Sequence, residues 1–172
     1  MEVWVLRLGH RIFRDQRVTT HCALVARAFG ASRIVYSGDR DKGLEETIRK
    51  VVEKWGGPFD IVYERQWKRF VKEWKGKVVH LTMYGLPIQE MIEEIRACKE
   101  DLLIIVGGKK VPAEVYELSD WNVSVTQQPH SEISALCLFL DRFFEGKELE
   151  KEFKGGRLKI IPSKREKTVV KL

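Results

Sequence analysis

Short apolar runs alternate with longer amphipathic segments along most of this chain, and this alternation is the feature that most constrains its fold. The run 101–108 is apolar at almost every position and rich in branched aliphatic residues. Such a run is typical of a strand buried on both faces, as in parallel sheets whose crossover connections are helices. The sequence therefore predicts an α/β fold: a mostly parallel sheet with helices on both faces.

The same patterns place the individual elements. Strands are expected at 3–8, 33–38, 59–64, 77–85, 101–108 and 121–126, and helices at 15–29, 44–55, 66–74, 87–99 and 130–144. Asp15 is the expected N-cap of the first helix, and Gly30 is the expected stop signal at its end.

The chain is expected to end in an appendage. Two short strand-like runs, 157–162 and 167–172, are joined by four polar residues, a pattern that predicts an antiparallel hairpin. We therefore divide the chain into an α/β domain over 1–147 and a basic extension over 148–172.

Composition excludes several classes of protein. With 172 residues, 44% hydrophobic and 33% charged, the chain fits one globular domain. No apolar stretch approaches the roughly 18 residues of a membrane helix, and Arg7 interrupts the first apolar run before a signal-peptide core forms, so we expect a cytoplasmic protein with no membrane partner. Cys22, Cys98 and Cys137 form no C-x-x-C pair, and the four histidines show no metal-ligand spacing, so no disulfide framework and no metal are expected.

Positive charge is concentrated at the two ends of the chain. Of the net charge of +6, residues 1–27 carry +3 and residues 147–172 carry +5, which leaves the middle mildly acidic. Basic ends on such a body fit a polyanion-binding surface, because neutralised phosphates release counterions. The alternative is an ordinary solvated surface rich in Lys and Glu.

Three predicted strands end in specialised segments: 80–87, 106–112 and 124–132. Ligands of open α/β sheets bind outside the carboxyl ends of the strands. The segment 106–112 matches neither a dinucleotide fingerprint nor a P-loop, but Gly107 and Gly108 allow a ligand to approach the backbone closely. The alternative is an ordinary β-turn, which two glycines by themselves would favour.

The segment 124–132 offers a run of polar side chains ahead of an apolar helix. These side chains can bond the amines and hydroxyls of a ligand. Ser131 and Glu132 can instead cap the helix, and the side-chain types alone do not separate these two interpretations.

The chain resembles a known family. The strings LLIIVGGKKVP (102–112) and NVSVTQQPHSEISALCLFL (122–140) resemble the second and third motifs of SPOUT-class methyltransferases. The string RDQRVTTHCALVARAFGA (14–31) resembles the first motif of the archaeal tRNA cytidine-56 ribose 2′-O-methyltransferases. The similarity runs from Glu2 through Phe144, and the basic hairpin continues it.

The resemblance implies a homodimer with a deep trefoil knot that binds S-adenosylmethionine in a bent conformation and methylates a ribose of tRNA, most specifically cytidine 56. By position, it implies a cofactor site made by Leu81, Gly107, Gly108, Lys109, Lys110, Val111, Val125, Thr126, Gln127, Gln128, Pro129, His130, Ser131 and Glu132.

The catalytic residues are expected in the first motif. Val18 and Leu24 occupy the places where the broader SPOUT pattern has Asn and Arg, so Arg17, or else Arg14, would supply the positive charge. Arg17 is the first candidate, because its guanidinium can hold phosphate and ribose together. His21, one helical turn further on, is chemically the easier proton acceptor, unless it merely packs beside its helix neighbours.

Two other functions stay open from the residues alone. One is a small α/β enzyme that uses another nucleotide cofactor, which the missing phosphate fingerprints disfavour. The other is a non-catalytic basic RNA-binding module, which would usually show surface aromatic residues among its cations.

Overall fold

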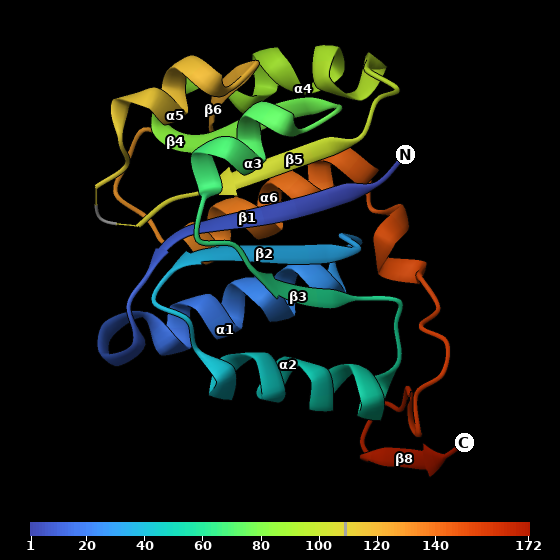
Figure 1. Cartoon of the computed structure of the whole chain (residues 1–172). Helices are drawn as coiled ribbons and strands as arrows, with labels where there is room; N and C mark the ends of the chain where they lie inside the picture. The colour runs from blue at the N-terminus through green and yellow to red at the C-terminus, as the bar shows by residue number, and fades with distance from the viewer. Residues whose placement is uncertain (109) are drawn as a thin grey trace.

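A six-stranded parallel sheet with helices on both faces forms the body of the molecule, as the sequence predicts (Figure 1). The computed structural model describes residues 1–108 and 110–172. The strand order is β3-β2-β1-β5-β4-β6, so β1 and β5 lie at the centre. The strands are β1 (Val3–His10), β2 (Arg33–Gly38), β3 (Asp60–Tyr63), β4 (Lys77–Pro87), β5 (Leu102–Val106) and β6 (Trp121–Ser124).

The two faces of the sheet carry different sets of helices, and the alternation of side chains along each strand separates two cores. Val5 and Ile104 point into the larger core, whereas Leu6 and Ile105 point into the smaller one. The larger core is covered by α1 (Ile12–Ala28), α2 (Lys42–Trp55), α4 (Ile88–Ala97) and α6 (Glu132–Phe144), and the smaller by α3 (Trp67–Glu73) and α5 (Ala113–Leu118). Within the described ranges, none of these helices is both long and apolar enough to cross a membrane.

Helix α5 has no counterpart among the elements expected from the sequence. It has six residues and buries one of them, Val115, so it is too short to show a helical period. Its position nevertheless matters, because it closes the smaller core directly after the segment 106–112.

The predicted start of α1 is wrong. The helix begins at Ile12, and Asp15 lies inside its first turn rather than at the N-cap, which is Arg11. The Asp15 carboxylate accepts hydrogen bonds from the Arg11 backbone N–H at 3.1 Å and from its guanidinium Nε at 2.8 Å. An acidic side chain that reaches back to the cap residue stabilises the first turn, so the helix extends upstream of it. The predicted end is right, since α1 stops before Gly30, whose φ is 101°.

The connection from β6 to α6 brings distant segments together. Strand β6 is an edge strand that pairs with β4, whereas α6 packs beside α1 against the larger core. The chain therefore returns from the edge of the sheet toward its middle between Val125 and Ser131. This return places the β6–α6 loop beside the β5–α5 loop, at the left of Figure 1.

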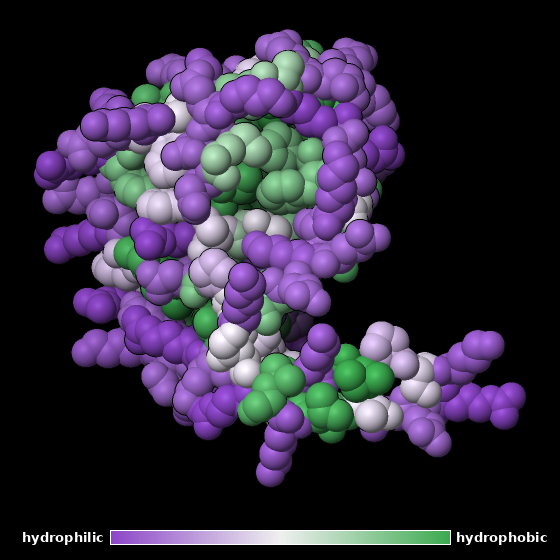
Figure 2. Space-filling model, turned by 90° about the vertical axis from the view of Figure 1, so that its right-hand side faces the viewer, coloured by the Kyte–Doolittle hydropathy of each residue, from purple (hydrophilic) through white to green (hydrophobic). Residues whose placement is uncertain are grey.

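The C-terminal hairpin is an arm on this body, as predicted. Strands β7 (Leu158–Ile161) and β8 (Thr168–Lys171) pair antiparallel after a short 3-10 turn, η1 (Lys147–Glu150). Figure 2 shows the arm projecting from the lower part of the molecule, with apolar side chains gathered along it. Ile160 is 60% exposed in this arm.

The two cores predict at which positions shortening a side chain destabilises the protein. Ile104→Ala removes a fully buried side chain from the centre of the sheet and should lower the free energy of unfolding by about 2–5 kcal/mol. The same change in the exposed arm, Ile160→Ala, should cost less than about 0.5 kcal/mol. Chemical denaturation at one protein concentration measures both, and equal losses would contradict the assignment of the core.

Candidate functional site

A cavity of about 450 Å³ opens at the carboxyl edge of the sheet, within the size range of ligand sites. Residues from three segments line it: the end of β4 with Leu81, the β5–α5 loop with Gly107 and Gly108, and the start of α6 with Glu132. These are the three strand ends that the sequence marks as specialised. The crossover described above is what brings the third of them to the other two.

Half of the predicted cofactor residues line this cavity: Leu81, Gly107, Gly108, Lys110, Val111, His130 and Glu132. Six others belong to the β6–α6 segment beside it but are not among the lining residues: Val125, Thr126, Gln127, Gln128, Pro129 and Ser131. Ser131 caps α6, since its hydroxyl accepts a hydrogen bond from the Ile133 N–H at 3.2 Å. Lys109 lies outside the described residues.

The walls of the cavity combine apolar side chains with bare backbone. Leu81, Val106 and Ala135 are buried and supply an apolar surface. A Cβ at Gly107 would collide with the side chain of Val111, so a larger residue there would displace part of the wall. A Cβ at Gly108 would make ordinary contacts of 3.5 Å or more. A ligand can therefore approach the backbone of the β5–α5 loop.

His80 is a functional candidate that the sequence reasoning missed. Its side chain is fully buried in the wall of the cavity, and its Nδ1 lies 2.9 Å from Oδ1 of Asn122. Burial lowers the pKa of the imidazole more than the bond to Asn122 raises it, so the ring is neutral at pH 7. Because Nδ1 donates its proton to Asn122, Nε2 is a bare acceptor, and it has no partner within the described part of the chain.

Arg7 is a second residue that the sequence reasoning missed. The side chain is 1% exposed, and its Nη1 donates hydrogen bonds to the carbonyl oxygens of Leu8 and Gly107. A buried guanidinium requires such acceptors. The contact ties the first residue of the β5–α5 loop to β1. A lone cation inside an otherwise apolar strand was the signal that could have revealed it.

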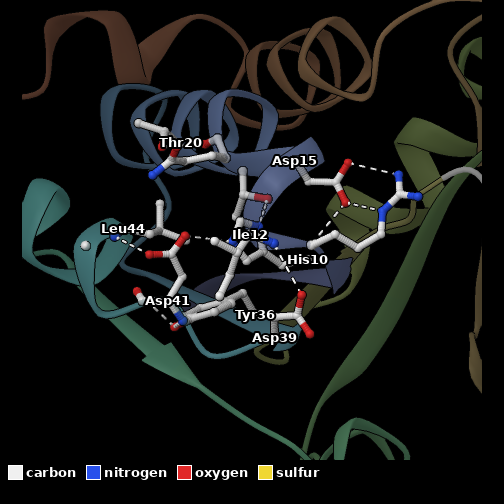
Figure 3. Close-up of polar contacts among 12 residues, drawn as sticks. His10, Ile12, Asp15, Thr20, Tyr36, Asp39, Asp41 and Leu44 are labelled. Atoms are coloured by element: carbon white, nitrogen blue, oxygen red, sulfur yellow. Dashed lines mark hydrogen bonds and ion pairs between the residues drawn. The ribbon is translucent and has the colours of Figure 1, made fainter.

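A buried polar network holds the start of α1 to α2 (Figure 3). His10, at the end of β1, directs Nε2 to the Asp41 carboxylate at 3.0 Å and Nδ1 to the Thr19 hydroxyl at 2.7 Å. His10 and Thr19 are almost fully buried. The network therefore sets the position of the N-terminal half of α1 from its inner side.

Asp41 is also the N-cap residue of α2. Its carboxylate caps that helix by accepting from the Leu44 N–H at 2.9 Å, and its backbone N–H donates to the Tyr36 hydroxyl, which in turn donates to Glu45. Burial alone would raise the pKa of the Asp41 carboxyl, but the hydrogen bonds from Leu44 and His10 outweigh burial and lower it. The carboxylate is therefore charged in the folded protein at neutral pH.

Arg17 and His21 lie outside the cavity. Both are exposed on α1, and neither lines the cavity at the carboxyl edge. The alternative in which His21 packs beside its helix neighbours is wrong, because its side chain faces solvent in this chain. Across the described residues, no three His, Cys, Asp or Glu side chains gather into a group that could hold a metal ion.

The sequence of the chain decides its family. Residues 55–170 match the family described as tRNA ribose 2′-O-methyltransferase, aTrm56. The chain belongs to the tRNA ribose 2′-O-methyltransferase family. It is 55% identical over 98% of its length to the tRNA (cytidine(56)-2′-O)-methyltransferase of Methanopyrus kandleri and covers 96% of that protein. It is 54% identical to the enzyme of that name from Pyrococcus horikoshii, with 98% and 84% of the two chains covered.

Solved structures share the fold of this tRNA ribose 2′-O-methyltransferase family member. An AdoMet-bound rRNA methyltransferase from Sinorhizobium meliloti superposes with a TM-score of 0.59 at 17% identity, over 84% of this chain and 56% of that one. The TrmH/SpoU tRNA modifying enzyme from A. aeolicus gives a TM-score of 0.59 at 12% identity, over 87% and 77% of the two chains. This chain thus spans little more than half of the first of these structures.

The buried network of this family member predicts a pH-dependent contribution to stability. Asp41→Asn keeps a helix cap but loses the charged partner of His10, and should lower the free energy of unfolding at pH 7 by about 1–3 kcal/mol. Because folding depresses the pKa of Asp41, its contribution is present above the unfolded value of 3.8 and is lost as the pH falls through the folded pKa. The difference between wild type and variant should therefore shrink below about pH 4.

Denaturation curves at a series of pH values measure this difference. Asp60→Asn is the matched control, because it removes an exposed carboxylate with the same change of charge. A difference between wild type and Asp41→Asn that stayed constant down to pH 2 would contradict a charged contact.

Proposed function

We propose that this chain transfers a methyl group from S-adenosylmethionine to the ribose 2′-hydroxyl of cytidine 56 in tRNA. Membership of the tRNA ribose 2′-O-methyltransferase family carries the proposal. The cavity at the carboxyl edge, bounded by the segments that resemble SPOUT motifs, supports it independently. A cytoplasmic location stays a prediction from the apolar pattern of the sequence, and a trefoil knot stays a prediction from the family resemblance.

The lining of the cavity suits S-adenosylmethionine. Glu132 and Lys110 carry opposite charges that match the ammonium and the carboxylate of the methionine moiety. Gly107 and Gly108 line the cavity and present loop backbone to it. The buried side chains around them exclude water from its apolar parts.

The protein has to position the reacting groups and stabilise charge. When bound, S-adenosylmethionine supplies a methyl group on a positively charged sulfur, and that sulfur leaves as a neutral thioether. Arg17 would hold the target phosphate and stabilise the 2′-oxygen as its proton leaves. A guanidinium stays protonated in proteins and is therefore a poor base, so His21, exposed on the same helix, is the better candidate to accept the proton.

The position of Arg17 and His21 outside the cavity has a consequence for how subunits assemble. Arg17 and His21 are exposed on α1 and line no part of the cavity of their own chain. We therefore infer a homodimer in which α1 of one subunit faces the cofactor cavity of the other. In such an arrangement each active site needs two subunits, and a monomer would be inactive.

Cytidine 56 also requires movement of the substrate. In folded tRNA this nucleotide is held in the elbow where the D and T loops meet. Reaching its 2′-hydroxyl requires local opening, at a cost of roughly a few kcal/mol. The basic ends of the chain offer binding energy that can offset this cost.

Gly108 provides a test of the cofactor site. Gly108→Val adds branched bulk where a ligand approaches the loop, and should weaken S-adenosylmethionine binding at least about tenfold, equivalent to about 1.4 kcal/mol. Gly108→Ala should weaken it less, because a single Cβ makes only ordinary contacts there. Calorimetric titration with S-adenosylmethionine, its demethylated product and a nicotinamide nucleotide measures affinity and specificity. Unchanged affinity for S-adenosylmethionine in a folded Gly108→Val variant would show that the cofactor binds elsewhere.

Mixed dimers test the role of Arg17. Arg17→Ala should depress the single-turnover rate without changing cofactor affinity, and Arg17→Lys should restore little, because the two-pronged geometry is lost. If Arg17 acts on the partner's site, mixing Arg17→Ala and Gly108→Val subunits rebuilds one intact site in each heterodimer. An equal mixture should then recover about a quarter of wild-type activity. No recovery, with heterodimers verified, would place Arg17 and the cofactor in the same subunit.

A further inference from the structure

We propose that a second cavity, beside the cofactor cavity, binds the phosphate–ribose backbone of the RNA strand next to the methylated nucleotide. The inference rests on the proposed function and names where that substrate is held. The cavity has a volume of about 600 Å³ and lies at the carboxyl ends of β1 and β2, against the segment that leads into α3. None of its residues except Gly108 and Lys110 belongs to the predicted cofactor site.

The two cavities share a wall. Gly108 and Lys110 line both of them, one cavity on each side of the β5–α5 loop. A strand bound in the second cavity is therefore held directly beside the site of methyl transfer. Neighbouring nucleotides of one strand are joined by a single phosphate, so contacts in one cavity can orient a ribose at the entrance to the other.

The charge of the second cavity suits a polyanion. Its described lining includes three cationic side chains, from Arg11, Arg65 and Lys110, and no acidic one. Arg11 is partly neutralised, since its Nε lies 2.8 Å from the Asp15 carboxylate. Arg65 is exposed and makes no ion pair or hydrogen bond with the described part of the chain. Its guanidinium is thus available to a phosphate, for which its fork is well shaped.

A buried hydroxyl and an aromatic ring add features that a simple charged surface lacks. Ser37 is 2% exposed, and its Oγ accepts a hydrogen bond from the Gly9 N–H at 3.2 Å. Its own proton has no acceptor among the described residues, so it can be donated to a phosphate or ribose oxygen. Trp67 is half-buried in the same lining and offers a ring on which a base can stack.

This combination selects a nucleotide over other anions. Arginine and lysine would bind any phosphate, but a cavity of this size that also carries a hydroxyl donor and an indole matches all three parts of a nucleotide: phosphate, sugar and base. Its junction with the cofactor cavity requires the nucleotide to belong to the substrate strand. The second cavity is therefore an RNA subsite that precedes or follows the target ribose.

Arg65→Ala tests the assignment. The variant should bind an in vitro transcribed tRNA that carries cytidine 56 about tenfold more weakly, and the slope of log affinity against log salt should fall by roughly 0.7–0.9 for the lost phosphate contact. Affinity for S-adenosylmethionine should not change. Arg65→Lys should recover part of the affinity, because it keeps the charge and loses the fork.

Arg69→Ala is the matched control. Arg69 lies in the first turn of α3, outside the cavity, where its Nε pairs with Glu73 at 2.8 Å, and its removal changes the net charge equally. Its tRNA affinity should stay within about twofold of wild type. If both variants lose tRNA affinity equally, a long-range effect of charge explains the loss and the subsite is not needed. If Arg65→Ala loses no tRNA affinity, the proposed subsite is wrong.

The test separates this inference from the proposed function. Weaker tRNA binding in Arg65→Ala, in a protein that neither binds S-adenosylmethionine nor methylates tRNA, would overturn the proposed reaction and keep the RNA subsite. Normal methylation and normal tRNA affinity in Arg65→Ala would overturn the RNA subsite and keep the proposed reaction.

Discussion

Burial of the central strands on both faces is the constraint on which the rest of the structure depends. β1 and β5 are covered by the larger core on one side and the smaller core on the other, so apolar side chains occupy both faces. Apart from the buried Arg7, the residues of β1 and β5 carry no Asp, Glu, Lys or Arg side chain. Both cavities consequently lie at the carboxyl edge, and the loop after β5 is the wall between them.

Two buried polar contacts determine how segments are positioned at this edge of the sheet. The Arg7 guanidinium holds the Gly107 carbonyl, and His10 joins Asp41 to Thr19. Leaving a buried charge or polar hydrogen without a partner is costly, so each contact restricts the position of its segment. The first positions the β5–α5 loop that lines the cavity at the carboxyl edge, and the second positions the helix that carries Arg17. Both segments are thereby attached to β1, a central strand of the sheet.

Local patterns predicted most of the fold. The strand over 33–38 has the predicted bounds, and the three specialised strand ends meet as expected, because apolar runs and glycine stops report burial and chain direction directly. Prediction failed for an element too short to show a pattern, and for a side-chain contact that the sequence pattern does not reveal. Helix α5 is too short for a period, and Asp15 was misplaced because the sequence does not show that its carboxylate reaches back to Arg11.

The sequence by itself determined the layered α/β architecture, the C-terminal hairpin and the family of the chain, since these follow from periodicity and from strings of adjacent residues. Tertiary structure alone decided that Ser131 caps a helix while Glu132 lines the cavity, and that His80 is fully buried beside Asn122. It also decided that Arg65 lies across one loop from the cofactor cavity. The physical reason is that burial and hydrogen-bond partners are properties of packed neighbours, which are distant in the sequence and become adjacent only when the parallel sheet forms.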